Sequence, residues 1–285
     1  MTALSVQAAM SVDVEDWFQV ENLSGAIARD TWDEREFRVE RNVDRMLELM
    51  RERGVRGTWF VLGWVAERAP ALVRRIAAEG HEVASHGFGH ELVGALTPER
   101  FQADVERSKK SLEDLTGAEV IGYRAPNFSI TDWSIDVLRS LGFRYDSSAF
   151  PTIAHRRYGK LSGVRPDQPI VELRPGFHEV CVSCLSLYGR RLPWGGGGYF
   201  RLLPYGVFRA GIQQILGTGR PYVFYIHPWE IDPDQPRVGG LRPNQAFRHY
   251  LNLGRAEARL GALLRDFEWT TIDNLLERWK AGAAA

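Results

Sequence analysis

Apolar strand-like stretches and amphipathic helix-like stretches alternate along almost the whole 285-residue chain. Apolar runs such as 57–63 (GTWFVLG) and 222–226 (YVFYI) are typical of buried strands. Segments 39–53, 70–80 and 97–117 carry apolar side chains at helical spacing, and a glycine ends or follows each of them. No repeat or low-complexity linker divides the chain. The alternation therefore favours a parallel βα barrel or a closely related layered fold.

Charge and cysteine content narrow the classes of function. Lys plus Arg and Asp plus Glu number 36 each, so no net field draws the chain to nucleic acid or to an acidic membrane surface. Cys181 and Cys184 are too few for a disulfide framework, and we interpret them as buried small apolar side chains rather than a metal or redox pair. The N-terminal segment lacks the basic region of a signal peptide, and no window is long enough to span a membrane. We therefore expect a cytoplasmic protein.

Polar side chains suited to catalysis follow the first and third predicted strands. The first strand ends in Asp13, Glu15 and Asp16, and the third is followed by His86 and His90. In parallel α/β folds, catalytic residues collect where strands end and loops begin. Two imidazoles plus one carboxylate form the ligand set of a hydrolytic zinc or similar divalent centre that keeps positions open for water and substrate. The alternative for the acids is that they cap a helix N-terminus.

Two further strands end in a basic side chain. Arg124 follows one in YRAPNF, and His227 follows a late one in YIHPWE. Taken singly, the arginine fits an ordinary ion pair and the histidine fits a buried structural role. The fact that all these residues fall at strand ends of one predicted sheet favours a shared active site.

In this order, SVDVED (11–16), SHGFGH (85–90), RAPNF (124–128) and YIH (225–227) resemble the motifs of the polysaccharide deacetylase family, of the NodB-homology or carbohydrate esterase 4 type. The resemblance covers about residues 8–275. It implies a distorted (β/α) barrel with about seven strands. It also implies a single domain over 1–285, with subgroup-specific loops and a C-terminal extension at about 176–285. DVEDWF, LPWGGGGYFRLLPY and HPWEID resemble the subgroup encoded with exosortase (PEP-CTERM) exopolysaccharide systems.

The resemblance also implies an activity. The family hydrolyses N-acetyl groups of amino sugars with a divalent metal, here expected to be zinc, with cobalt and nickel as alternatives. The substrate would be an N-acetylated polysaccharide, oligosaccharide or exopolysaccharide precursor, and exopolysaccharide assembly machinery is the expected partner. The implied site residues are the base Asp13, the acid His227, Arg124 to hold the base ionised and aimed, and the metal ligands Glu15 or Asp16, His86 and His90.

Substrate contacts are expected from loops rich in glycine, proline and aromatics. Residues 150–169 and 186–203 are predicted to be long surface loops, and the run GGGG (195–198) a flexible lid or a close-approach turn. Sugar rings offer apolar faces that pack on aromatic rings. The expected substrate-binding residues are Pro126, Phe128, Trp194, Tyr199 and Trp229.

The first and fourth family motifs depart from the usual pattern. Val14 separates Asp13 from Glu15, and no tryptophan-rich fourth motif stands out, so Asp146, Trp194 or Trp229 are candidates for its role. Two alternatives to deacetylation follow. One is an amidohydrolase of the same fold that acts on a small cyclic amide or ureide, and the other is a non-catalytic saccharide-binding subunit.

Overall fold

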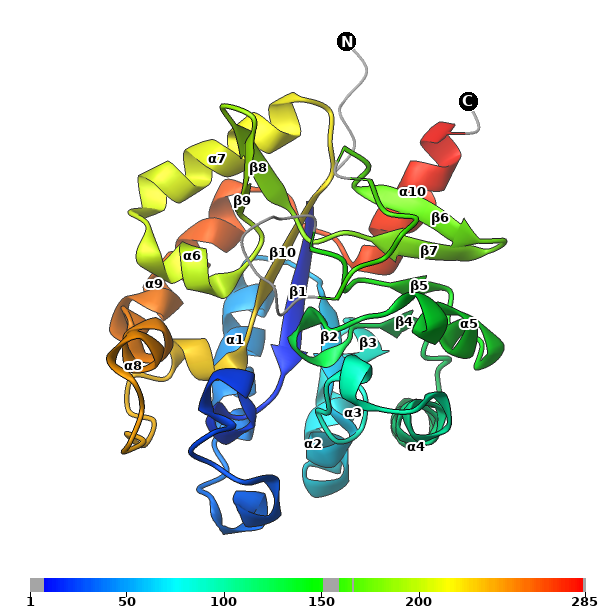
Figure 1. Cartoon of the computed structure of the whole chain (residues 1–285). Helices are drawn as coiled ribbons and strands as arrows, with labels where there is room; N and C mark the ends of the chain where they lie inside the picture. The colour runs from blue at the N-terminus through cyan, green and yellow to red at the C-terminus, as the bar shows by residue number, and fades with distance from the viewer. Residues whose placement is uncertain (1–7, 151–158, 166, 284–285) are drawn as a thin grey trace.

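A computed structural model describes residues 8–150, 159–165 and 167–283. Its main feature is one curled sheet that forms an open half-barrel, with helices around its outer side (Figure 1). The sheet order is β10-β1-β2-β3-β4-β5-β7-β6. The strands are β10 (Tyr222–Ile226), β1 (Ala8–Val14), β2 (Thr58–Val61), β3 (Glu82–Ser85), β4 (Gly122–Tyr123), β5 (Tyr145–Asp146), β7 (Phe177–Val180) and β6 (Ile170–Arg174).

All neighbouring pairs in this sheet are parallel except the edge pair β6–β7, which is antiparallel. The predicted distorted (β/α) barrel is therefore confirmed, with seven strands running parallel and an eighth at the edge. Every residue of β1 is buried, as expected for a strand in the middle of a sheet that is covered on both faces.

Helices fill most of the connections between strands. Their bounds are α1 (Val39–Glu52), α2 (Gly63–Arg68), α3 (Pro70–Ala78), α4 (Pro98–Thr116), α5 (Asp132–Ser140), α6 (Gly197–Leu202), α7 (Tyr205–Gly217), α8 (Pro243–Tyr250), α9 (Leu253–Asp266) and α10 (Ile272–Ala283). Short 3-10 turns are η1 (Trp17–Gln19), η2 (Glu21–Leu23), η3 (Arg29–Glu34), η4 (Val93–Ala95), η5 (Pro126–Phe128) and η6 (Pro228–Ile231).

The amphipathic pattern explains how these helices pack. In α1 the side chains of Val39, Val43, Met46, Leu47 and Met50 are buried at three- and four-residue spacing, and they join the main apolar core. Residues of the chain's two halves contribute to this core together, because β1 from the N-terminus lies between β2 and β10. No helix among the described residues is long and apolar enough to cross a membrane.

The prediction of a long surface loop over 186–203 is wrong. This segment contains part of a hairpin, β8 (Cys184–Leu187) and β9 (Arg190–Pro193), followed by α6. The hairpin closes through Tyr188 and Gly189, both with positive φ (48° and 74°), which is the geometry of a two-residue turn. Of the other predicted loop, 151–158 and 166 lie outside the described residues, and the described remainder contains no helix or strand.

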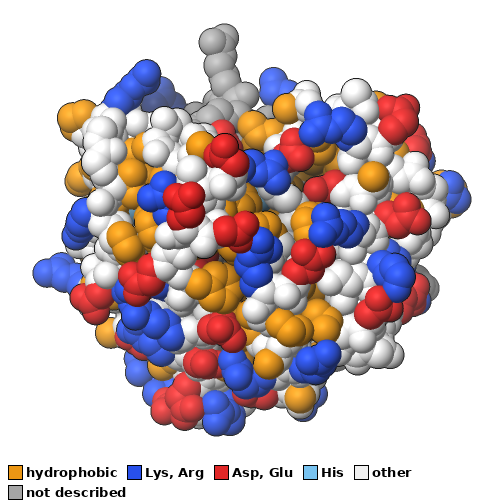
Figure 2. Space-filling view, turned by 90° about the horizontal axis from the view of Figure 1, so that it is seen from below, with side chains coloured by type: hydrophobic (Ala, Val, Ile, Leu, Met, Phe, Trp, Pro, Cys, Tyr) orange, Lys and Arg blue, Asp and Glu red, His pale blue; other side chains and the backbone are white. Residues whose placement is uncertain are grey.

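The candidate site lies at the carboxyl ends of the parallel strands. In Figure 1, β1 points toward the lower end of the molecule, and its carboxyl end and that of β10 lie side by side. Figure 2 views the molecule from that end. Basic and acidic side chains are interspersed over this face, with apolar side chains between them near its middle.

Candidate active site

Three acids follow β1, but they serve different purposes. Asp13 and Glu15 are buried and line the main cavity. Asp16 points elsewhere: its carboxylate accepts hydrogen bonds from the backbone N–H groups of Trp17 (2.8 Å), Arg38 (2.6 Å) and Val39 (2.9 Å). It therefore caps η1 and the start of α1. For this acid, the helix-capping role that the sequence left open as an alternative is the one observed. The prediction of Asp16 as a metal ligand is corrected: the chain has turned after β1, and only Glu15 faces the two histidines.

The 86–90 turn brings His86 and His90 together. The backbone has positive φ at Gly87 (73°) and at His90 (55°), and the second value is rare for a residue with a side chain. Asp104 of α4 holds the turn by accepting the N–H groups of Phe88 (2.7 Å) and Gly89 (3.0 Å). The two imidazole centroids lie 5.4 Å apart as a result. Strained backbone of this kind at a ligand-bearing turn is typical of functional sites.

Glu15, His86 and His90 form a cluster suited to a cation. Their candidate donor atoms all lie within 4.8 Å of one another, and all three residues are buried. His86 Nδ1 donates to the carbonyl oxygen of Arg124 (2.8 Å). The lone pair of Nε2 is therefore free to bind a cation. Burial lowers the pKa of His86 to about 4, so its imidazole is neutral.

Two buried atoms of this cluster test the fit directly. His86 Nε2 and Glu15 Oε2 have no hydrogen-bond partner among the described residues. Oε2 lies 2.8 Å from His90 Nε2 without hydrogen-bond geometry. Buried polar atoms without partners are costly, and a divalent cation would satisfy both of them. The side chains present therefore fit a metal ion held by two imidazoles and one carboxylate.

Asp13 lies next to this cluster and is fixed by Arg124. Arg124 is fully buried, and its Nη1 donates to Asp13 Oδ1 (2.7 Å) and to Ser11 Oγ (2.8 Å). The other guanidinium nitrogens donate to Ser147, Nε to its carbonyl oxygen (2.8 Å) and Nη2 to its Oγ (2.9 Å). This fork leaves Arg124 a single orientation, so Asp13 also has one.

His227 completes the site from the end of β10. Its Nε2 lies 3.0 Å from Glu15 Oε1 and 3.8 Å from Asp13 Oδ2, while its Nδ1 lies 3.0 Å from Glu230 Oε2. Burial disfavours the charged imidazole, but the carboxylates of Glu15 and Glu230 outweigh it and raise the pKa of His227 to about 10. Arg201 in turn donates through Nε to Glu230 Oε1 (2.8 Å).

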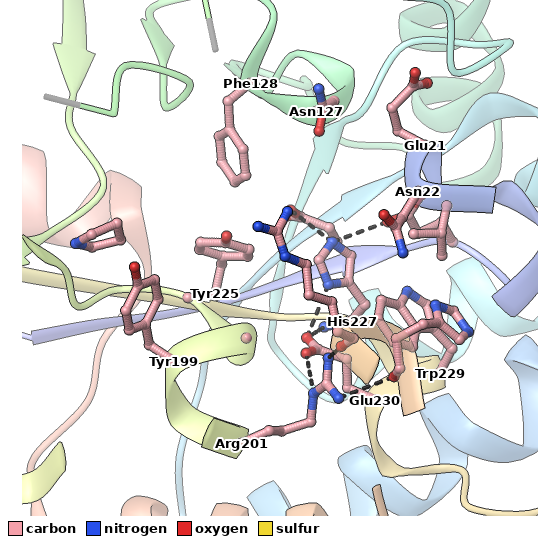
Figure 3. Close-up of a pocket in the computed structure, with 18 of the residues that line it drawn as sticks. Glu21, Asn22, Asn127, Phe128, Tyr199, Arg201, Tyr225, His227, Trp229 and Glu230 are labelled. Atoms are coloured by element: carbon pink, nitrogen blue, oxygen red, sulfur yellow. Dashed lines mark hydrogen bonds and ion pairs between the residues drawn. The ribbon is translucent and has the colours of Figure 1, made fainter. Parts of the chain in front are cut away.

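These groups face a cavity of about 450 Å³ with a mixed polar and aromatic lining. In Figure 3, Asn127 and Phe128 lie on one side of His227, Arg201 and Glu230 on the opposite side, and Tyr199 and Tyr225 beside it. Phe128, Tyr199 and Trp229, which sequence reasoning selected as substrate-binding, all line this cavity.

Trp194 and Pro126 do not line it, and their prediction as substrate contacts is corrected. Trp194 stacks on Phe208 in the core (5.6 Å between ring centroids) and donates its indole N–H to the Phe208 carbonyl (2.9 Å). Pro126 is buried at the start of η5, where it shapes the turn that presents Phe128. Asp146, a candidate for the fourth family motif, is buried beside Glu179, away from the cavity lining.

The GGGG run is a close-approach segment that leads into α6. A Cβ on Gly197 would overlap Glu230 Oε2, and one on Gly196 would lie 2.5 Å from the Tyr225 hydroxyl oxygen. Glycine is needed here so that α6 and its Arg201 reach Glu230.

Sequence reasoning missed Glu230, Arg201 and Asp104. Glu230 stands three residues after His227 in HPWE, a spacing that could have indicated a partner for the imidazole. Arg201 and Asp104 act across long sequence separations, and no local pattern indicates them. The two cysteines are buried and unpaired, and burial raises the pKa of Cys184 to about 12, as expected for unreactive thiols.

Two segments of the chain are similar to known protein families. Residues 28–145 match a family model described as polysaccharide deacetylase, and residues 147–277 match one described as a domain of unknown function (DUF3473). A peptidoglycan deacetylase-like protein from Gibberella zeae is 34% identical over 108 residues, which are 37% of this chain and 32% of that protein. A peptidoglycan deacetylase from Helicobacter pylori is 32% identical over 112 residues, 39% of this chain and 38% of that protein.

A crystal structure of a polysaccharide deacetylase-type protein from Mycobacterium smegmatis has a TM-score of 0.63 at 22% identity, covering 98% of this chain and 92% of the other. That likeness shows the shared fold. Residues 28–145, about two fifths of the chain, are the segment that is similar to the polysaccharide deacetylase family. The chain spans about a third of the length of these two curated relatives.

Proposed function

We propose that this protein is a metal-dependent hydrolase that removes N-acetyl groups from amino sugars of a polysaccharide or exopolysaccharide precursor and releases acetate. One observation carries the proposal: Glu15, His86 and His90 converge, with Asp13 and His227 beside them in the same cavity. The matched family and the peptidoglycan deacetylases among the relatives support the reaction type. We infer that both matched segments work as one catalytic unit, because His227 and Glu230 come from the second.

Glu15, His86 and His90 would hold the divalent cation, and zinc is the ion we propose. When bound, such an ion lowers the pKa of water and polarises a carbonyl group, the two effects that amide hydrolysis needs. Asp13 acts as general base and accepts a proton from the attacking water. Arg124 aims this carboxylate, because its Nη1 donates to Asp13 Oδ1 while Ser11 and Ser147 hold the same guanidinium in place.

His227 acts as general acid. Its Nε2 faces the cavity between Asp13 and Glu15, while Nδ1 faces Glu230, so the proton for the leaving amine is on the cavity side. Glu230 stabilises the charged imidazole, and Arg201 fixes Glu230. The amide nitrogen departs as a free amine after it receives this proton, and acetate remains.

Metal analysis combined with acetate release tests the proposal. We expect one divalent ion per chain and acetate release from N-acetylglucosamine oligomers. Replacing His86 or His90 with alanine should abolish both. His178→Ala is the matched control, because this histidine is also buried but lies in β7, outside the cavity lining. Full activity in either site variant contradicts the metal role.

The same measurements separate the two alternatives. Activity on hydantoin-like compounds with none on acetylated sugars indicates a cyclic amidohydrolase. Tight glycan binding without acetate release, in metal-loaded protein, indicates a non-catalytic saccharide-binding subunit.

A further inference from the structure

Helix α8 presents one side to the mouth of the catalytic cavity. Asn244, Phe247 and Arg248 all line the cavity, and their spacing of three and four residues places them on one side of the helix. We call these three residues the α8 face. Phe247 is 58% exposed, and it is one of a few large apolar side chains that the described part of the chain leaves open to solvent. An exposed aromatic ring at the rim of a cavity is a common ligand contact.

The helix is tied to the catalytic groups, so the α8 face has a fixed position relative to them. Arg201 donates to the carbonyl oxygens of Arg248 (3.0 Å), His249 (3.0 Å) and Leu251 (2.6 Å), while its Nε donates to Glu230. One guanidinium thus connects the C-terminal turn of α8 to the carboxylate that contacts the proposed acid. Rigid support of this kind is what a substrate-positioning surface requires.

Ring stacking provides a second connection. The His249 ring stacks on Trp229 (4.5 Å, 11° between planes), and Trp229 stacks on His227 (5.4 Å, 25°). In addition, η2 is joined to α8 through Asn22, whose Nδ2 donates to the Gln245 carbonyl oxygen (3.0 Å). The α8 face is therefore preorganised rather than attached through a loop.

We propose that the α8 face is a subsite for a carboxylate-bearing sugar, such as a uronate, that adjoins the N-acetylated unit undergoing hydrolysis. The inference rests on the proposed deacetylase function and names the substrate class of the same site. The ring of the neighbouring sugar packs on Phe247, its hydroxyls bond the Asn244 amide, and its carboxylate binds the Arg248 guanidinium.

Charge distribution favours this occupant. The other arginine of the cavity lining, Arg201, is buried and engaged by Glu230 and backbone carbonyls. Arg248 is exposed, and its side chain makes no ion pair within the described part of the chain. A free guanidinium beside an exposed phenylalanine matches a sugar with one apolar face and one carboxylate. Glu21 also lines the cavity, and its carboxylate would repel such a ligand. Removing this charge should therefore strengthen the preference for the acidic sugar, whereas removing the charge of Arg248 should weaken it.

The experiment compares two forms of one tetrasaccharide. The first is a hyaluronan tetrasaccharide, in which N-acetylglucosamine alternates with glucuronate, and the second is the same molecule with its carboxyls methyl-esterified. We expect the metal-loaded full chain to deacetylate the acidic form with a kcat/KM about tenfold higher, through a lower KM, because one charge-assisted contact is lost in the ester.

Variants assign the effect to residues. Arg248→Gln should abolish the preference by raising KM for the acidic form to that for the ester, whereas Phe247→Ala should raise KM for both forms. Glu21→Gln should increase the preference. Arg74→Gln, on the exposed side of α3, removes the same charge from a site that does not line the cavity and should change neither form. Equal kcat/KM for both forms in the wild type, or a preference that survives Arg248→Gln, overturns the proposal.

Binding distinguishes this inference from the proposed function. Calorimetry in the Asp13→Asn background measures the affinity for both forms without turnover. If no acetate is released from any acetylated sugar, the deacetylase function fails. Tighter binding of the acidic form that is lost in Arg248→Gln still supports the subsite, and equal binding refutes it.

Discussion

Replacing Arg124 with lysine tests most directly how the proposed base, Asp13, is oriented. The arginine makes four hydrogen bonds from a fully buried position: one to Asp13, one to Ser11, and two to Ser147. Lysine keeps the positive charge but has one compact ammonium in place of a planar fork. It therefore retains at most the contact to Asp13 and one neighbour, and it leaves the two acceptors on Ser147 with fewer donors.

The expected magnitudes follow from those contacts. Hydrogen bonds that involve a charged group contribute about 1.5–3 kcal/mol each, so the loss of two bonds should lower the free energy of unfolding by about 3–6 kcal/mol. Asp13 loses its fixed orientation at the same time. A misplacement of the order of 1 Å at a reacting group costs about 10²-fold in rate, so kcat should fall by about that factor. Metal content should stay unchanged, because Glu15, His86 and His90 are untouched.

The assay measures kcat and KM for acetate release, bound metal, and urea unfolding on the same preparations. Ser147→Ala is the graded control: it removes Oγ, which accepts from Arg124 and donates to the Val180 carbonyl, but it leaves the carbonyl contact to Arg124, and it should cost about 2–4 kcal/mol and less than tenfold in kcat. Should Arg124→Lys unfold at wild-type urea concentration and turn over at the wild-type rate, the view that this fork orients the base is refuted.

Three other predictions concern neighbouring features. Burial raises the pKa of Glu82 to about 7 from 4.5, so the folded state binds the extra proton, and the free energy of unfolding should fall by up to about 3 kcal/mol as pH rises from 4.5 to 7. The difference between wild type and Glu82→Gln in urea unfolding from pH 4 to 8 isolates this slope, and a flat difference contradicts it. Asp104→Ala frees two backbone N–H groups of the 86–90 turn and should weaken metal affinity by about 10- to 100-fold in a competition titration with a chelator. Glu230→Gln should lower kcat by about 10²-fold with metal content intact, since His227 loses its carboxylate partner, and an unchanged kcat shows that Glu230 is not needed.

The fold and the approximate place of the site follow from local patterns. Buried apolar runs and helices that end at glycine are short-range signals, and they predict parallel strands whose ends carry Asp13, His86, Arg124 and His227. Residues 186–203 were mispredicted because glycine and proline there serve tight contacts, at the Tyr188–Gly189 turn and under Glu230, rather than an irregular loop.

The local sequence pattern does not determine the direction in which a side chain points. Glu15 and Asp16 are adjacent and chemically similar, yet one faces the histidines and the other caps α1, because the chain turns directly after β1. The same limit applies to tryptophan. Trp194 and Trp229 both follow strands and both look suited to sugar contact, but Trp194 packs against α7 in the core while Trp229 lines the cavity.

Pairing between β1 and β10 joins residues that precede the first matched segment to residues of the second matched segment. The register aligns Ser11 with Tyr225 and Val12 with Ile226, so the next residues, Asp13 and His227, emerge together at the end of the sheet. A chain that stopped after residue 145 would retain the base and the cluster of Glu15, His86 and His90. It would lose the acid, and it would expose the edge of β1 that β10 covers. Because Glu230 and Arg201 also come from the later segment, the matched deacetylase segment supplies only part of the proposed catalytic machinery, and the second segment supplies the proton donor and its support.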